Sequence, residues 1–188
     1  MAPPGRSRRI ALVGGSFNPP HVGHLLLAQY VYATQDVEAV WLMPSASHPL
    51  GKQLTPFPER RALCESLVAE GGPWLSVTDV EQRLGGEGRT VDTLEYLVQA
   101  HPELSFTVVV GSDIVPELPL WKDVPRIREL ATLLIVHRAG HPDPLAVGPP
   151  LVEISSSAIR AALREGHDVS ALVPRAVLAR IDAQRLYR

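Results

Sequence analysis

Cysteine, net charge and long apolar runs are all scarce in this sequence. Cys64 is the only cysteine in 188 residues, which excludes an internal disulfide and suits the reducing cytoplasm. Eighteen Lys and Arg residues nearly balance 20 Asp and Glu residues, so the formal net charge of −2 offers no overall field that would gather nucleic acid or an anionic membrane. No apolar run approaches the roughly 20 residues that a membrane-spanning helix needs.

The composition that remains is that of a globular protein, with 45% hydrophobic and 20% charged residues. A length of 188 residues fits one domain, which we expect to span 1–188. The basic start "MAPPGRSRR" is followed by too few apolar residues for a signal peptide, and we expect residues 1–8 to form a flexible lead-in. The sequence leaves both a monomer and a homodimer open.

Short apolar runs alternate with helical patterns along the whole chain. We expect strands over 9–15, 38–44, 74–80, 104–113, 132–138 and 151–155, and helices over 22–35, 58–72, 90–102, 124–131, 156–166 and 174–186. The Pro- and Gly-rich stretches 44–58, 85–88 and 139–150 are predicted to be loops. This alternation predicts an α/β fold with a single Rossmann-like, doubly wound and mainly parallel sheet, whose ligands bind beyond the carboxyl ends of the strands.

The segment "GGSFNPPHVGHL" follows the first expected strand directly. Gly14, Gly15 and Ser16 stand at the carboxyl end of that strand, where the missing glycine side chains let a ligand approach the backbone. The two prolines that follow should delay the next helix until His21 or Val22. Free amides and the positive dipole end of this helix would then face the same place, which favours a phosphate ligand.

His21 and His24 fall on one face of the first turn of that helix, where each can donate to phosphate oxygens. A pair with this spacing can equally be packed or capping histidines. A zinc site needs three or four ligands, and no further ligand stands at a recognisable spacing, so we expect no metal ligands here. The glycines match neither the dinucleotide fingerprint nor the P-loop, which disfavours an oxidoreductase and a Walker-type hydrolase.

A second candidate anion site lies near the carboxyl terminus, in "EISSSAIRAALREG". An expected strand is followed by three serines that can cap the next helix, and Arg160 falls in its first turn on the same face as Ser157. Serines before a helix are often plain caps. It is the pairing with the first motif that indicates phosphate binding.

Both motifs are familiar from one superfamily. "GGSFNPPHVGHL" resembles the GxFxPxHxGH signature of the nucleotidyltransferases, and "ISSSAIR" resembles their ISSTxxR signature. The stretches "GRTVDTL", "VVGSDIVPELPLW", "IVHRAGHP" and "LVPRAVLARIDAQRLYR" are similar to bacterial nicotinate-nucleotide adenylyltransferases, almost end to end. The resemblance implies that ATP, with Mg²⁺, and nicotinate mononucleotide are joined to give nicotinate adenine dinucleotide and pyrophosphate, a step of NAD biosynthesis.

The resemblance also implies which residues bind ATP. His24 would stabilise the α-phosphate in the transition state, His21 would support the triphosphate, and Arg160 would take the β- and γ-phosphates. Gly111 and Asp113 would line the nucleoside, although an Asp after a strand is often only a helix cap. The other implied ATP contacts are Gly14, Gly15, Ser16, Phe17, Gly23, Arg138, Ser155, Ser156 and Ser157.

A separate group would bind nicotinate mononucleotide. By the same resemblance, Trp121 would stack on the pyridine ring, backbone amides near Thr90 and Lys122 would receive the carboxylate, and Ser45 would add a contact. Amide donors would prefer a carboxylate to a carboxamide, which brings its own N–H groups. Plain packing remains an alternative for Trp121.

Three places depart from the family pattern. The usual P-P-H-[KR] loop is replaced by "SASHPLGKQLTP", in which His48 and Lys52 either restore a phosphate contact from shifted positions or leave it weaker. Asn18 stands where Asp is commoner, and we expect the lost charge to have had a structural role. Ser157 replaces the usual Thr and keeps its hydroxyl.

Two rival functions remain open. Another transferase of the superfamily, using nicotinamide mononucleotide or phosphopantetheine, is disfavoured by Trp121 and by "TVDTL". A noncatalytic nucleotide-binding module would be favoured by loss of a motif histidine, yet His21 and His24 are both present.

Overall fold

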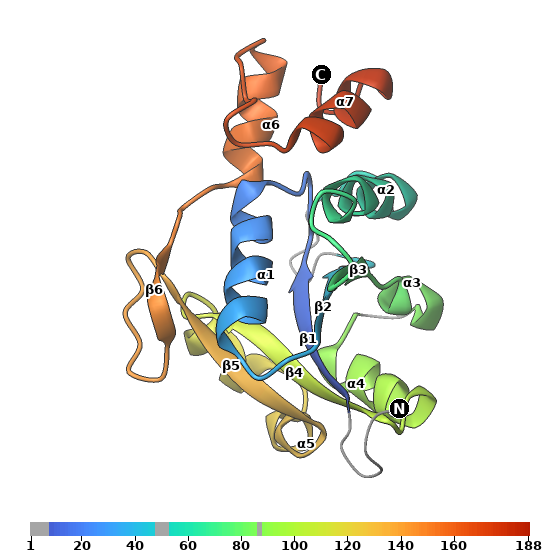
Figure 1. Cartoon of the computed structure of the whole chain (residues 1–188), viewed down its shortest axis with the longest axis vertical. Helices are drawn as coiled ribbons and strands as arrows, with labels where there is room; N and C mark the ends of the chain where they lie inside the picture. Colours follow the sequence, from blue (N-terminus) through green and yellow to red (C-terminus); the bar gives the residue numbers. More distant parts are fainter. Residues whose placement is uncertain (1–7, 48–52, 86–87) are drawn as a thin grey trace.

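The computed structural model describes residues 8–47, 53–85 and 88–188, and these contain one six-stranded parallel sheet (Figure 1). The strands are β1 (Arg8–Gly15), β2 (Ala39–Pro44), β3 (Leu75–Val77), β4 (Leu104–Gly111), β5 (Ala131–Arg138) and β6 (Val147–Leu151). Their order is β3-β2-β1-β4-β5-β6, and each neighbouring pair is parallel. The chain therefore winds outward from β1 in both directions, which confirms the predicted doubly wound sheet.

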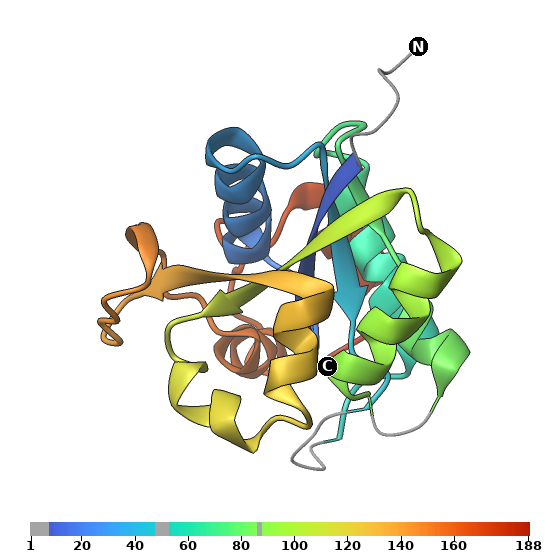
Figure 2. The same ribbon diagram turned by 90° about the horizontal axis from the view of Figure 1, so that it is seen from below.

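Helices cover both faces of this sheet (Figure 2). They are α1 (Val22–Thr34), α2 (Phe57–Val68), α3 (Val80–Leu84), α4 (Thr90–Ala100), the 3-10 helix η1 (Val115–Leu120), α5 (Val124–Leu130), α6 (Ser156–Arg164) and α7 (Arg175–Ala183). Buried side chains of α1, α2, α6 and α7 share one core cluster, and those of α3, α4, η1 and α5 share the other. Figure 1 shows α6 beyond the end of α1, with α7 beside it.

The sequence of the central strand β1 does not alternate between apolar and polar residues, because both of its faces are buried. Ala11 and Val13 belong to the core cluster on one face, while Ile10 and Leu12 belong to the cluster on the other. All four are at most 2% exposed. A parallel strand covered on both faces needs apolar residues at every position, and this confirms the strand predicted over 9–15.

The predictions fail mainly at the edges of the sheet. Strand β6 lies mostly within the stretch 139–150, which is predicted to be a loop. Of the strand predicted over 151–155, only Leu151 belongs to β6. Its sequence "VGPPL" holds two prolines, which an edge strand tolerates because one of its sides has no partner strand. At the other edge, β3 is shorter than the predicted 74–80, since α3 already begins at Val80. Neither α3 nor η1 was predicted.

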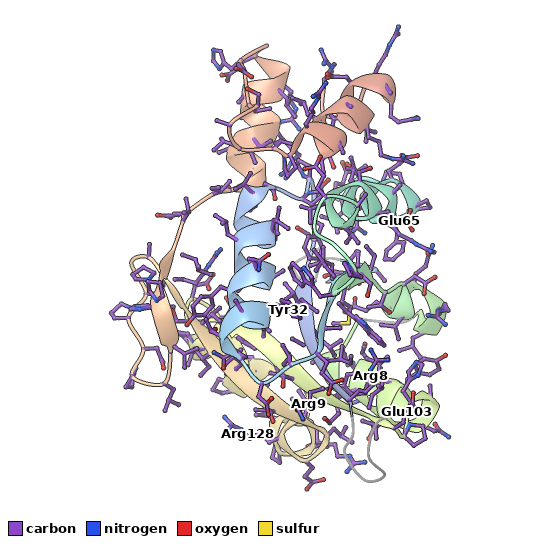
Figure 3. All side chains as sticks on the ribbon, viewed as in Figure 1. Arg8, Arg9, Tyr32, Glu65, Glu103 and Arg128 are labelled. Atoms are coloured by element: carbon purple, nitrogen blue, oxygen red, sulfur yellow. The ribbon has the colours of Figure 1, made fainter. Side chains whose placement is uncertain are left out.

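Charged side chains tie the amino-terminal ends of β1 and β2 together. Arg9 contacts Asp36 at 2.7 Å, and Arg8, which begins β1, contacts Glu38 at 3.6 Å. Figure 3 shows Arg8 and Arg9 at the end of the molecule away from α6 and α7. Arg8 belongs to β1, so the flexible lead-in expected over 1–8 is wrong at this residue. The other residues of that stretch lie outside the described part. None of the helices in the described ranges is long and apolar enough to cross a membrane.

Candidate active site

The predicted site residues gather where strands end and the following helices begin. Gly14 and Gly15 end β1, Ser45 follows β2, Gly111 ends β4 and Arg138 ends β5. The first turns of three helices carry others, namely Gly23 and His24 on α1, Thr90 on α4, and Ser156 and Ser157 on α6. Carboxyl ends of parallel strands meet at one edge of a sheet, so most of the predicted residues share that edge. His48 and Lys52 lie outside the described residues.

Hydrogen bonds join the two sequence motifs directly. Arg160 donates from Nη1 to the carbonyl oxygen of Asn18 at 2.6 Å and from Nη2 to Oγ of Ser157 at 3.3 Å. The hydroxyl of Ser156 donates to the carbonyl oxygen of Pro19 at 2.9 Å. The start of α6 is therefore fixed against the turn that leads into α1, and the two candidate anion sites form one surface.

The imidazoles of His21 and His24 stack at the start of α1, with ring centroids 3.8 Å apart. His21 is the N-cap residue, and its backbone N–H donates to Nδ1 of His24 at 3.1 Å. A neutral imidazole that accepts at Nδ1 carries its proton on Nε2. His24 therefore offers one oriented N–H donor, and the Phe17 ring, with its centroid 4.7 Å away, helps to hold it.

Burial keeps both histidines neutral. It lowers the pKa of His21 to about 4, with a further contribution from the positive charge of Arg138. The pKa of His24 is also well below its usual value, because of burial first and then of His21 and Arg138. Nδ1 of His21 is buried without a hydrogen-bond partner among the described residues. The site thus presents uncharged imidazole groups at neutral pH, one of which has an unused polar atom.

The start of α1 is less open to an anion than we predicted. The amide of Val22 donates to the carbonyl oxygen of Leu172 at 2.9 Å, and the amide of His24 donates to the carbonyl oxygen of His21 at 2.9 Å. At α6, Oγ of Ser155 accepts from the amide of Ala158 at 3.4 Å. The amides of 156 and 157 in its first turn have no partner within the described residues. At α1 the amides of Val22 and His24 are occupied, so an anion between the two helices would also rely on the first amides of α6.

The ends of β4 and β5 bring Gly111, Asp113 and Arg138 together. Oδ1 of Asp113 lies 3.6 Å from Nε of Arg138. A Cβ on Gly111 would overlap Asp113 and lie 3.0 Å from Cγ of Arg138, so this pair requires the glycine. The buried Ser112 is not among the predicted residues. Its hydroxyl donates to the carbonyl oxygen of His141 at 2.6 Å and accepts from the amide of Arg138 at 2.8 Å. Ser112 thereby joins the two strand ends.

Two of the residues predicted for the second substrate, Ser45 and Lys122, are each held by a neighbouring element. The amide of Ser45 donates to the carbonyl oxygen of Gly15 at 2.9 Å, which joins the ends of β2 and β1. Nζ of Lys122 lies 3.0 Å from Oδ1 of Asp92 in the first turn of α4, the helix that begins at Thr90. Trp121 is partly buried and packs against the core cluster beneath α4. No contact described in the structure joins Trp121 to Ser45.

Asn18 has the structural environment that we expected for the position. It is 3% exposed, and its Oδ1 accepts from the hydroxyl of Tyr187 at 2.8 Å. An amide oxygen supplies this acceptor as well as a carboxylate would, without a buried charge. Tyr187 is not among the predicted residues, although its place in the "LYR" tail is a signal. Nor is Arg60, whose helix is predicted but whose burial is not.

Converging polar groups, and not a metal-ligand cluster, mark this site within the described residues. No group of three or more His, Cys, Asp or Glu side chains is placed to hold a metal ion in the part of the chain that the structure describes. Two hollows of about 480 and 520 Å³ lie elsewhere, at the amino-terminal end of β5 and beside β3. Neither is lined by a predicted site residue. The site is defined by its converging polar groups.

Comparisons with known proteins show the family and the fold of the chain. The family model described as cytidylyltransferase-like matches residues 12–162. A "Probable nicotinate-nucleotide adenylyltransferase" of Myxococcus xanthus is 52% identical over 179 residues, which cover 95% of this chain and 94% of that protein. One of Anaeromyxobacter dehalogenans is 48% identical and covers 96% and 97%. The structure of Plasmodium falciparum nicotinic acid mononucleotide adenylyltransferase complexed with NaAD has the same fold, with a TM-score of 0.79 at 18% identity over 96% of this chain and 97% of that one.

Proposed function

The chain belongs to the nicotinate-nucleotide adenylyltransferases of the cytidylyltransferase-like family, and we propose that it joins ATP and nicotinate mononucleotide in NAD biosynthesis. The products are nicotinate adenine dinucleotide and pyrophosphate. One observation carries the proposal. Arg160 and Ser156 of α6 are hydrogen-bonded to the turn at Asn18 and Pro19, which makes one surface of the two phosphate-binding motifs.

The reaction requires no nucleophile from the protein. An oxygen of the mononucleotide phosphate attacks the α-phosphorus of ATP, and the bond from that phosphorus to the bridging oxygen breaks, so that pyrophosphate leaves with the electron pair. A phosphate monoester has its second pKa near 6 and is mostly dianionic at pH 7. The protein has to hold the two substrates in line and stabilise the charge that develops, which is catalysis by positioning and preorganised donors.

We assign the triphosphate to the surface between α1 and α6. Nε2 of His24 would donate to an α-phosphate oxygen, and the neutral imidazole can do so without losing its proton. Arg160 and the first amides of α6 would hold the β- and γ-phosphates, and Asp113 would accept from a ribose hydroxyl. ATP enters as its Mg²⁺ complex, in which the metal neutralises part of the phosphate charge.

We assign nicotinate mononucleotide to the carboxyl end of β2 and the amino-terminal end of α4. Trp121 would stack on the pyridine ring, and amides near Thr90 and Lys122 would receive the carboxylate. The Lys122–Asp92 contact supports this proposal because it keeps the segment after η1 against the first turn of α4. Ser45 would face the mononucleotide next to Gly15, so that the nucleophile approaches the end of β1.

The state of Cys64 supports a cytoplasmic reaction. The thiol is free and buried on α2, and burial raises its pKa far above the usual range. Such a thiol stays protonated and does not react. A single unpaired cysteine of this kind is typical of proteins of a reducing compartment.

A parallel assay tests the proposed activity. The protein is supplied with ATP, Mg²⁺ and either nicotinate mononucleotide, nicotinamide mononucleotide or phosphopantetheine, and pyrophosphate release is followed. We expect kcat/KM to be at least about tenfold higher for the nicotinate form, because amide donors satisfy a carboxylate and leave the N–H groups of a carboxamide unpaired. Equal rates with the two mononucleotides would remove the acid preference, and release only with phosphopantetheine would change the proposed substrate.

Gly23 provides a test of the histidine pair. A Cβ there would lie 3.1 Å from Nδ1 of His21 and 3.6 Å from Cβ of Ile154. A Gly→Ala change inside a helix usually stabilises it by up to about 1 kcal/mol. Here the methyl group would crowd the buried His21 ring, which must shift by a few tenths of an ångström. Because this ring stacks on that of His24, we expect Gly23→Ala to lower kcat/KM about tenfold.

The comparison for Gly23→Ala is Gln29→Ala, an exposed change on the same helix. Kinetics and thermal unfolding of both variants are measured together. We expect the unfolding temperature of Gly23→Ala to stay within a few degrees of the parent value. A Gly23→Ala protein as active as Gln29→Ala would show that the imidazole can move without consequence.

A further inference from the structure

Arg60 occupies a position on α2 that the packing would suit to an apolar side chain. It shares the buried face of the helix with Phe57, Leu63, Cys64 and Leu67, and it is only 1% exposed. A buried guanidinium keeps its charge and must be hydrogen-bonded to compensate for lost water. The partners of this group therefore show what it is there to hold.

The guanidinium of Arg60 donates to backbone carbonyl oxygens of three separate segments. Nε donates to Thr55 at 2.7 Å, Nη1 to Ser16 at 2.8 Å and Nη2 to Ser45 at 2.7 Å. Ser16 directly follows β1, and Ser45 directly follows β2. One rigid, planar group thus sets the distance between the ends of two neighbouring strands.

Glu81 of α3 contacts the peptide group between Ser45 and Ala46 from the side opposite Arg60. The peptide group that contains the Ser45 carbonyl also contains the amide of Ala46, and that amide donates to Oε2 of Glu81 at 3.0 Å. Glu81 is 6% exposed, and its charge interacts with that of Arg60. A cation and an anion therefore fix the plane of the Ser45–Ala46 peptide group from its two ends.

We propose that Arg60 and Glu81 are positioning residues for the transfer step, which fix the mononucleotide side of the site at Ser45 relative to the ATP side at Ser16. The inference rests on the proposed function, which assigns these two sides. Both residues act through the backbone and not on the reacting atoms. An in-line attack needs the phosphate oxygen and the α-phosphorus in close approach, and a displacement of about 1 Å costs roughly a hundredfold in rate. The two charges hold that approach distance.

Arg60→Lys is the first variant that tests this proposal. Lysine keeps the charge, but its single ammonium group cannot donate in the plane of three carbonyl oxygens. We expect kcat to fall about tenfold while KM for each substrate changes less than about threefold, because each half of the site still binds its own substrate. A lost substrate contact would raise KM instead. A smaller folded fraction would also lower the apparent kcat at constant KM, so kcat is calculated per folded protein, with the folded fraction measured by thermal unfolding.

Glu81→Gln is the second variant, and it removes the charge while it keeps the size of the side chain. The glutamine oxygen can still accept from the amide of Ala46, so we expect a smaller fall in kcat, about threefold, again with unchanged KM. Arg61→Lys is the matched control. Arg61 is the next residue of α2, is 43% exposed and pairs with Glu65 and Asp79, so this change should leave both constants within about twofold of the parent values.

The outcomes separate this inference from the proposed function. Transfer by the parent protein tests the function, whatever the variants do. Suppose that the parent is active and that Arg60→Lys is folded. If the variant then keeps the parent kcat, or loses only substrate affinity, the positioning role is wrong. If Arg60→Lys does not fold, Glu81→Gln decides, since an unchanged kcat in that variant contradicts the proposal and a reduced kcat at constant KM supports it.

Discussion

His24→Ala should lower kcat at least about a hundredfold while the protein keeps its fold. The loss is the size expected when one preorganised donor to a developing negative charge is removed. The structure supports this because Nδ1 of His24 accepts from the His21 amide at 3.1 Å and so directs the remaining N–H away from the helix. Steady-state kinetics with both substrates, together with thermal unfolding, provide the measurement. His167→Ala, which replaces an exposed histidine paired with Glu165, is the control and should keep the parent rate.

The pH profile gives this experiment a second readout. The pKa of His21 is lowered to about 4, and that of His24 is lowered as well, so both imidazoles stay neutral as pH falls from 8 to 6. The acid limb of kcat/KM should instead follow the second ionisation of the mononucleotide phosphate, near pH 6. We therefore expect the same limb in the parent and in His24→Ala. A limb that disappears in the variant would assign it to an imidazole and contradict the neutral donor.

The central part of the fold was predictable from the sequence because burial on both faces leaves a clear pattern. Every position of "IALV" in β1 is apolar, and no other common element needs this over so short a run. The edges lack such a signal. Strand β6 contains Gly148, Pro149 and Pro150, which ordinarily indicate a loop, and only its pairing with β5 makes it a strand. Tertiary pairing overrides local preference there.

The candidate site was predictable where short motifs combine several unusual residues. The glycines, prolines and histidines of 14–25 and the serines before Arg160 could each be located, and hydrogen bonds join the two segments. The residues that hold the site in place through the backbone were not predictable. Arg60 resembles any helical arginine until its burial is known, and Ser112 resembles any small residue at a strand end. The carbonyl oxygen of Leu172 accepts from the Val22 amide at the start of α1, and no local sequence pattern predicts this contact between distant segments.

Arg160→Ala should lower kcat/KM for ATP about a hundredfold, with a much smaller effect on KM for nicotinate mononucleotide. Pyrophosphate leaves with more negative charge than its oxygens carried in ATP, so a fixed cation near the β- and γ-phosphates stabilises the transition state. The Asn18 carbonyl accepts from Nη1 of Arg160 at 2.6 Å and Oγ of Ser157 accepts from Nη2 at 3.3 Å, which orients the planar fork and leaves its remaining N–H groups for phosphate. Arg160→Lys keeps the charge without the fork and should recover only part of the loss.

The control for Arg160 lies one turn further along α6. Arg164 is exposed and belongs to the same helix, so Arg164→Ala removes an equal charge without touching the turn at Asn18. Initial rates at varied ATP and varied mononucleotide separate the two substrates. If Arg164→Ala loses as much as Arg160→Ala, the effect is one of net charge. If Arg160→Ala instead raises KM for the mononucleotide alone, the assignment of the triphosphate to α6 is wrong, and the serines and the arginine of that helix serve the other substrate.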